Sequence, residues 1–442
     1  MGVATTYNPG ANAASRGDSS PGVTEPPAAL FMSRFNAILL VAFIFGAWPA
    51  FSADPPQGTT VAQAKVIVVP EALPPEDDID PATGLARDTI VRPLRDSASP
   101  PPPARLPAEA PVAARNARPH IALILPTASQ SLGRLAEAVR TGFAAAREVA
   151  GAQAPPVNVT AVESEGPVLV DACRHSQATG ALIIVAGLTR DGARTLATSD
   201  CARVPVLALN EVLLPDPGDK LPANVFSISL SLDQEARQAA LMAVADGLHS
   251  AVVVSSASPL SKRVQEAFER EWTRAAGEIR RVTYSGNPED APALRERVLA
   301  AHADMVFIAL DPPEARSVRP YVPAMLPIYA TSLSVNPRAE PVVNVDMQGV
   351  RYGEMPWFVQ PDHPAVMVYP QPRESMSVDQ ERLYALGIDA LRLALLLLRP
   401  EEARAQLDGV TGRITLEPDN SFLRTLVPSE VDGGRVIPRI AP

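Results

Sequence analysis

The most constraining feature of the sequence is a strand, a loop and a helix between residues 118 and 150. His120 to Leu125 reads as a short apolar strand, and a strand that is apolar on both faces belongs inside a sheet covered by helices on both sides. The polar loop Pro126 to Ser131 then leads into a long helix whose apolar residues recur every three or four positions. The unit therefore predicts an α/β fold.

The same strand, loop and helix order repeats along the rest of the chain. Strands that alternate with single helices indicate parallel pairing through right-handed crossovers. The further strands that the pattern predicts are residues 157–162, 181–186, 204–209, 226–229, 251–255, 279–284, 304–310 and 327–330. A capping box at Ser377 to Gln380 opens a late helix with an apolar end. Because Arg382, Asp389 and Arg392 interrupt that helix, we expect a buried core helix and no membrane span.

These elements predict two doubly wound, Rossmann-like lobes joined by three chain crossings. We place the crossings near Leu230–Ser231, at Trp357 to Gln360, and at Leu407 to Val410. Lobe 1 is then residues 118–230 with 359–407, and lobe 2 is residues 231–358 with 410–440. This division assigns the segment TGRITL, residues 411–416, to lobe 2.

The first 117 residues lack this pattern. Residues 32–53 have a short basic start, an apolar stretch from Ala37 to Ala47 and a small-residue exit, which is the layout of a signal peptide. Residues 1–31 precede it, and we interpret them as a disordered stretch in front of a start codon assigned too early. Residues 54–117 are rich in proline, including Pro100 to Pro103, which favours a disordered tether.

Charge and cysteine content limit the partners and the compartment. The formal net charge is −10, so nucleic-acid binding has no electrostatic basis. The sequence contains two cysteines, Cys173 and Cys201. In an oxidising compartment they could form a disulfide, whereas two separate buried thiols explain them equally well.

The sequence contains no recognisable catalytic or metal-binding motif. The five histidines are scattered without the spacing that places two ligands on one helix face. No glycine-rich phosphate loop or nucleophile elbow follows a strand. We therefore expect no enzymatic activity, no metal and no cofactor.

Small polar side chains follow several predicted strands. In open α/β sheets, ligands bind at the carboxyl ends of the strands, so two facing lobes would form a cleft there. The candidate cleft residues are Thr127, Ser129, Gln130, Ser131, Thr189, Asn210, Ser255, Ser256 and Asp311. For any one of these residues, capping of the following helix is the simpler explanation.

Several segments together resemble a known family. They are FSISLSLDQEARQAA (226–240), SPLSKRVQEAFEREWTRAAG (258–277), VDMQGVRYGEMPWF (345–358), RLYALGIDALRLA (382–394), DGVTGRITLEPDN (408–420) and GGRVIP (433–438). In this order they are similar to the penicillin-binding protein activator family of the LpoA (LppC) type, which has a type I periplasmic-binding-protein fold.

The resemblance implies a non-enzymatic regulator, associated with the outer membrane, that stimulates a bifunctional class A penicillin-binding protein during peptidoglycan synthesis. Two features depart from the family pattern. A Pro-rich tether stands where better-known members have a helical-repeat domain, and no lipobox cysteine lies near Ser52. We therefore expect an exported periplasmic protein without a lipid anchor. The alternative is a periplasmic solute-binding protein that delivers a small polar ligand to an ABC transporter.

Overall fold

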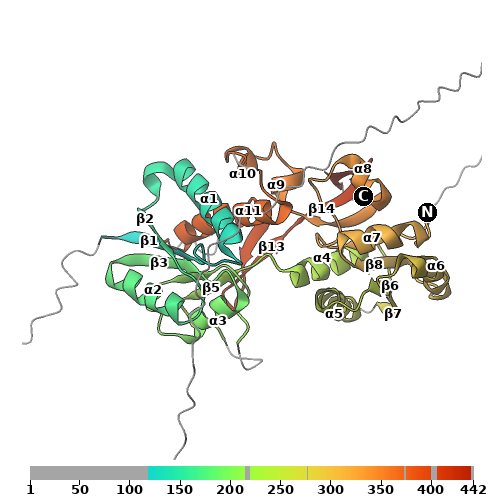
Figure 1. Cartoon of the computed structure of the whole chain (residues 1–442), viewed down its shortest axis with the longest axis horizontal. Helices are drawn as coiled ribbons and strands as arrows, with labels where there is room; N and C mark the ends of the chain where they lie inside the picture. The colour runs from blue at the N-terminus through green and yellow to red at the C-terminus, as the bar shows by residue number, and fades with distance from the viewer. Residues whose placement is uncertain (1–117, 215–219, 276, 373–374, 400–405, 440–442) are drawn as a thin grey trace, which may run out of the picture. The chain divides into compact units, whose positions relative to one another are not determined.

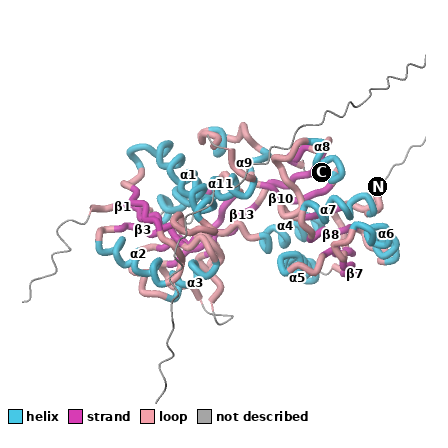
Figure 2. The backbone as a smooth tube through the Cα atoms, viewed as in Figure 1, coloured by secondary structure: helices cyan, strands magenta, loops and turns pink. Residues whose placement is uncertain are grey.

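The computed structural model in Figures 1 and 2 describes residues 118–214, 220–275, 277–372, 375–399 and 406–439. All of them belong to one compact unit, residues 102–442. The predicted start region 1–31, signal peptide 32–53 and tether 54–117 lie outside the described residues.

The first sheet has eight strands in the order β11-β12-β13-β5-β4-β3-β1-β2. Its strands are β1 (His120–Leu125), β2 (Val157–Ala161), β3 (Ala181–Ala186), β4 (Val206–Ala208), β5 (Val225–Ile228), β11 (Leu407–Asp408), β12 (Arg413–Leu416) and β13 (Ser421–Thr425). Strands β1 to β5 pair in parallel, β13 joins β5 in parallel, and β11 and β12 add an antiparallel edge. β4 begins two residues later than predicted because Pro205, which precedes it, has no N–H to donate to the ladder, and β4 ends one residue earlier, at Ala208.

Helices cover both faces of this sheet, as Figure 1 shows. The helices are α1 (Gly133–Ala150), α2 (Pro167–Ala178), α3 (Arg190–Thr198) and α11 (Val378–Leu397). In β1, Ile121 and Leu123 face the core that contains α1 and α11, whereas Ala122 and Ile124 face the core that contains α2 and α3. The alternation follows from the two-residue period of a strand, and it explains why β1 is apolar throughout.

The second sheet has seven strands in the order β15-β14-β10-β9-β8-β6-β7. Its strands are β6 (Ser250–Ser255), β7 (Glu278–Thr283), β8 (Met305–Ala309), β9 (Ile328–Ala330), β10 (Val350–Glu354), β14 (Val427–Asp432) and β15 (Arg435–Pro438). The helices of this part are α4 (Leu232–Ala245), α5 (Pro259–Arg274), α6 (Ala291–Ala300), α7 (Pro312–Val318) and α8 (Pro341–Asn344). Helices α4 and α5 lie on one face, and α6 and α7 lie on the other. The predicted α/β fold with two doubly wound lobes is confirmed.

The segment that follows β8 does not form one continuous helix. Helix α7 ends at Val318, and a separate 3-10 helix follows at Arg319–Tyr321. The reason lies in Pro320 and Pro323, because proline removes a helical hydrogen bond and clashes with the preceding turn.

The late apolar helix, α11, packs against α1 and shares a core with Ile121, Leu123 and Leu125 of β1. The two short helices before it, α9 (Pro356–Val359) and α10 (Pro364–Met367), lie between the second sheet and α11 in the sequence. Helix α11 thus packs on the first sheet.

The predicted third crossing is wrong. TGRITL, which we assigned to lobe 2, contains β12, and β12 pairs with β13 in the first sheet. The chain passes to the second sheet between β13 and β14, around Leu426. Asp389 of α11 explains the error, since its carboxylate accepts the backbone N–H groups of Val410 and Thr411 and so keeps this turn on the first lobe.

Candidate functional site

The candidate residues after β1 form a polar turn at the start of α1. The Ser129 hydroxyl accepts the N–H of Leu132 at 3.4 Å, and the Ser129 carbonyl accepts the N–H of Gly133 at 2.9 Å. Gln130 and Ser131 are exposed, and Thr127 is half-buried. Ser129 therefore shapes the loop, and Thr127 faces a groove described below.

The candidate residues after β3 and β4 form hydrogen bonds with nearby backbone groups. Thr189 caps α3 by accepting the N–H of Gly192 at 3.0 Å. The Asn210 amide donates to the carbonyl of Leu188 at 2.8 Å, which fastens the end of β4 to the end of β3. Glu165, which the sequence analysis did not single out, accepts the N–H groups of Leu188 and Thr189 at 2.8 and 2.6 Å.

In the second lobe, the candidate residues form hydrogen bonds with the helices that follow β6 and β8. The Ser255 hydroxyl donates to Gln265 of α5, and the backbone N–H of Ser256 donates to Ser261 at 2.7 Å. Asp311 caps α7 by accepting the N–H of Glu314 at 2.9 Å. These contacts match the simpler explanation for such residues, that they cap or fasten helices.

One ionic chain runs from the end of β3 to the second lobe. Arg190, next to Thr189, lies 3.6 Å from Glu211 and 3.8 Å from Asp233 of α4. Asp233 in turn pairs with Arg263 of α5 at 2.9 Å. Arg190, beside the candidate residue Thr189, therefore contacts the second lobe.

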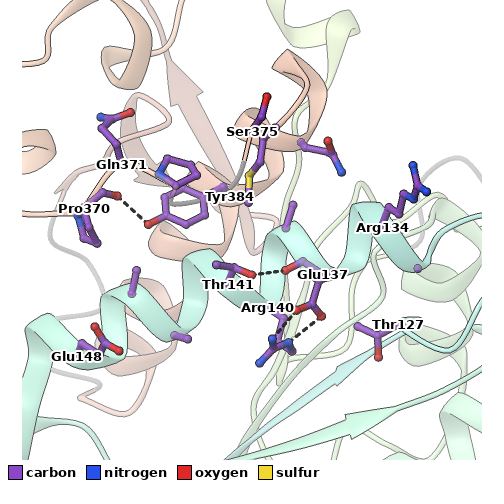
Figure 3. A pocket seen from close by; sticks show the side chains of 17 residues that line it. Thr127, Arg134, Glu137, Arg140, Thr141, Glu148, Pro370, Gln371, Ser375 and Tyr384 are labelled. Atoms are coloured by element: carbon purple, nitrogen blue, oxygen red, sulfur yellow. Dashed lines mark hydrogen bonds and ion pairs between the residues drawn. The ribbon is translucent and has the colours of Figure 1, made fainter.

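A groove of about 840 Å³ runs along the outer face of α1. Figure 3 shows Arg134 and Glu148 toward its opposite ends, with Tyr384 and Pro370 across from the helix. The Tyr384 hydroxyl donates to the Pro370 carbonyl at 2.8 Å, which fixes the far wall. Of the candidate residues, Thr127 lines this groove.

The groove is lined by charged and hydrogen-bonding side chains. Glu137 forms an ion pair with Arg140 on the α1 wall, and the Thr141 hydroxyl donates to the Glu137 carbonyl at 2.8 Å. Burial raises the pKa of Tyr384 to about 12, with a smaller contribution from the charge of Glu148, so its phenol stays protonated at neutral pH. Across residues 118–439, apart from the gaps, no group of three or more histidine, cysteine or acidic side chains is placed to hold a metal ion.

The two cysteines are joined. Cys173 of α2 and Cys201 form a disulfide with Cα atoms 6.0 Å apart, and both residues are fully buried. The bridge joins α2 to the segment between α3 and β4, within the core that contains Leu169 and Leu196.

The structure contains a buried cluster of charged side chains that the sequence did not predict. Glu235, Glu354 and Arg424 are 4%, 1% and 1% exposed, and Arg382 pairs with Glu354 at 3.1 Å. Such residues are almost never buried unless they are paired. The only available signal was Arg382, a charge within a helix predicted to be core, and the sequence could not show its partner 28 residues away.

Comparison with known proteins places the chain in a family. The family model described as "LppC putative lipoprotein" matches residues 114–301 and 296–431. The chain belongs to the LppC family. The matched residues include every strand of the first sheet and, in the second sheet, every strand up to β14, whose last residue and the following β15 lie beyond the match.

Relatives of this LppC chain carry a common name. Penicillin-binding protein activator LpoA of Escherichia coli (strain K12) is 25% identical over 309 residues, which are 59% of this chain and 44% of the relative. The LpoA of Glaesserella parasuis serovar 5 is 24% identical over 324 residues, which are 72% of this chain and 54% of the relative. The chain therefore spans about half the length of the curated relatives it matches.

Solved structures show the same fold. Full-length LpoA from Haemophilus influenzae has a TM-score of 0.59 at 22% identity and covers 72% of this chain and 58% of its own. A protein described as "a putative branched-chain amino acid ABC transporter from Chromobacterium violaceum ATCC 12472" has a TM-score of 0.61 at 35% identity, over 71% of this chain and 100% of its own. The LppC chain thus shares its fold with both groups.

Proposed function

We propose that this LppC chain is a non-enzymatic regulator that binds a bifunctional class A penicillin-binding protein and stimulates peptidoglycan synthesis. The observation that carries the proposal is the family match over residues 114–431, together with relatives named penicillin-binding protein activator. The C-domain of the Haemophilus influenzae relative, described as "a regulator of PBP1A", is covered over its whole length.

We place this activity in the periplasm, where peptidoglycan is assembled. The signal-peptide pattern at residues 32–53 supports export, and so does the disulfide between Cys173 and Cys201, because such bonds persist in oxidising compartments. No helix in the described part of the chain is long and apolar enough to span a membrane.

A second candidate function is solute binding for an ABC transporter. The observation that favours it is the 35% identity to the Chromobacterium violaceum protein. The ligand would then sit in a cleft lined by the candidate residues of both lobes, with Arg190 and Asp233 supplying charges at its edge. These two groups would suit the carboxylate and ammonium of an amino acid.

A binding titration separates the two functions. We would immobilise the full mature chain and titrate it with a solubilised class A penicillin-binding protein of the same organism, and separately with leucine by calorimetry. The regulator predicts saturable binding of the synthase and no heat with leucine. Heat with leucine and no synthase binding would favour the transporter function instead.

A further inference from the structure

The three crossings between the sheets carry buried polar side chains. Glu235 follows the first crossing, Glu354 ends β10 before the second, and Arg424 lies in β13 before the third. All three are less than 5% exposed. Burying a charge without a partner is costly. The hydrogen bonds and ion pairs of these residues therefore stabilise the backbone at the crossings.

Arg424 and Gln238 join the first crossing to the third. The Arg424 Nε donates to the carbonyl of Ser229 at 2.8 Å, and Ser229 lies in the first crossing. Gln238 of α4 donates its amide to the carbonyl of Arg424 at 2.7 Å and accepts the N–H of Leu426 at 2.9 Å. One side-chain amide therefore satisfies backbone groups on both sides of Thr425, where the chain leaves the first sheet.

Arg382 and Glu354 fasten the second crossing. Arg382 belongs to α11, which packs on the first sheet, whereas Glu354 belongs to β10 of the second. Their charged groups are 3.1 Å apart, with side-chain exposures of 12% and 1%. The second oxygen of Glu354 accepts the N–H of Met355 at 2.8 Å, which fixes the carboxylate at the turn.

The buried acidic and basic side chains near the crossings offset one another's charge. Burial raises the pKa of Glu235, and the positive charges of Arg424 and Arg382 oppose this rise. The Glu235 carboxylate also accepts the N–H of Ser332, beyond β9, at 2.9 Å. Two carboxylates and two guanidinium groups from four different elements thus act on one another in a region from which water is largely excluded.

We propose that these contacts clamp the three crossings, so that the two sheets keep one relative orientation whether or not a small solute is present. Hinge closure changes a few backbone torsions at the connections between domains. Here such a change would break the Arg424–Ser229, Gln238–Leu426 and Arg382–Glu354 contacts and leave buried polar groups unpaired, which is strongly unfavourable. The chain then presents a preset surface to a partner.

The clamp goes beyond the proposed function, because it holds whether or not a synthase is the partner. It does bear on the alternative, since a solute-binding protein that closes on its ligand needs mobile crossings. A clamped protein would recognise its partner by an external surface. Synthase binding and the state of the crossings are therefore measured separately.

The test is a distance distribution by pulsed electron paramagnetic resonance on the full mature chain. Spin labels on non-canonical residues at Arg194 of α3 and Arg274 of α5, both exposed, leave the disulfide intact. We expect a single narrow distribution that saturating leucine does not change. A broad distribution, or a shorter distance with leucine, would overturn the clamp.

Substitutions in the contacts at the crossings test which side chains keep the two sheets in one orientation. Glu354→Gln keeps the shape and removes the charge that faces Arg382, and we expect it to add a second distance population. Gln238→Ala removes the amide and leaves every charge in place, so it carries the test if Glu354→Gln does not fold, as judged by near-UV circular dichroism. The matched control is Glu137→Gln, an exposed ion-pair residue within the first lobe, which should match wild type. Narrow, unchanged distributions in the folded clamp variants would refute the proposal.

Discussion

Gly142 of α1 lies directly against the backbone carbonyl of Tyr384 in α11. A Cβ atom at Gly142 would collide with that oxygen, and a Cβ at Gly387 would collide with the carbonyl of Val139 in α1. The two helices therefore approach each other through paired glycines, and this close crossing holds α11 on the first sheet.

We predict that Gly142→Ala destabilises the protein by about 2 kcal/mol or more, because the added methyl group forces the helices apart in a packed core. Urea unfolding measures the free energy. Glu148→Ala, an exposed change on the same helix, serves as the control and should stay within about 0.5 kcal/mol of wild type. If Gly142→Ala is as stable as its control, the helices do not cross this closely.

Asp389 is the second stability test. This fully buried carboxylate accepts hydrogen bonds from the Thr411 N–H and hydroxyl at 2.8 and 2.7 Å and pairs with Arg392 at 3.1 Å. Asp389→Asn removes the buried charge that pairs with the partly exposed Arg392 and replaces one acceptor oxygen by a donor, so we expect a loss of about 3 kcal/mol. Thr411→Val removes only the hydroxyl contact and should cost about 1 kcal/mol. Equal losses in the two variants would contradict this ranking.

The disulfide makes a prediction that depends on redox conditions. Cys173 and Cys201 close a loop with a sequence separation of 28, and cross-linking such a loop stabilises a protein by about 3–4 kcal/mol on the chain-entropy model. Reduction should lower the urea midpoint of wild type and leave a Cys173→Ser/Cys201→Ser double variant unchanged. Non-reducing peptide mapping checks the pairing directly, and recovery of both thiols free in protein exported to the periplasm would disprove it.

Asp246 gives a pH dependence. Its carboxylate accepts hydrogen bonds from the Tyr329 hydroxyl and from Arg439 at 2.6 Å, and Arg351 lies 3.3 Å away. Burial pushes the pKa of Asp246 upward, but these partners outweigh burial and hold it below its usual value. Because the folded pKa is the lower one, this stabilisation is complete above the unfolded pKa of about 3.9 and is lost as the pH falls through the folded value.

Acid unfolding measures that contribution. Wild type should lose stability more steeply than Asp246→Asn as the pH falls from about 5 to below 3. Asp191→Asn, an exposed residue with a side-chain exposure of 87%, is the matched control and should follow wild type. Parallel profiles for wild type and Asp246→Asn would show that Asp246 makes no such contribution.

Local patterns in the sequence predicted most of the two sheets. The apolar run at Ile121–Leu125 indicates a buried strand, and the capping box at Ser377 indicates the start of a helix. Both signals depend only on residues that are neighbours in the sequence. The place of β12 was not predictable in this way. It depends on Asp389 reaching two N–H groups more than 20 residues away.

The candidate site shows the same limit. Thr189 and Asp311 were recognisable as polar residues after strands, and the structure shows them capping helices. The cluster of Glu235, Glu354 and Arg424 was not recognisable, since each member comes from a different element and each looks like an ordinary surface charge in the sequence. Only the assembled crossings bring these side chains together.

The function proposed for this LppC chain is stimulation of a cell-wall synthase by protein contact. The most direct measurement is the rate at which a purified class A penicillin-binding protein of the same organism forms glycan strands and cross-links from lipid-linked precursor, with and without the full mature chain. We expect a saturable rise in the rate that reduced, urea-unfolded chain does not produce. An unchanged rate at concentrations that saturate the synthase would contradict it.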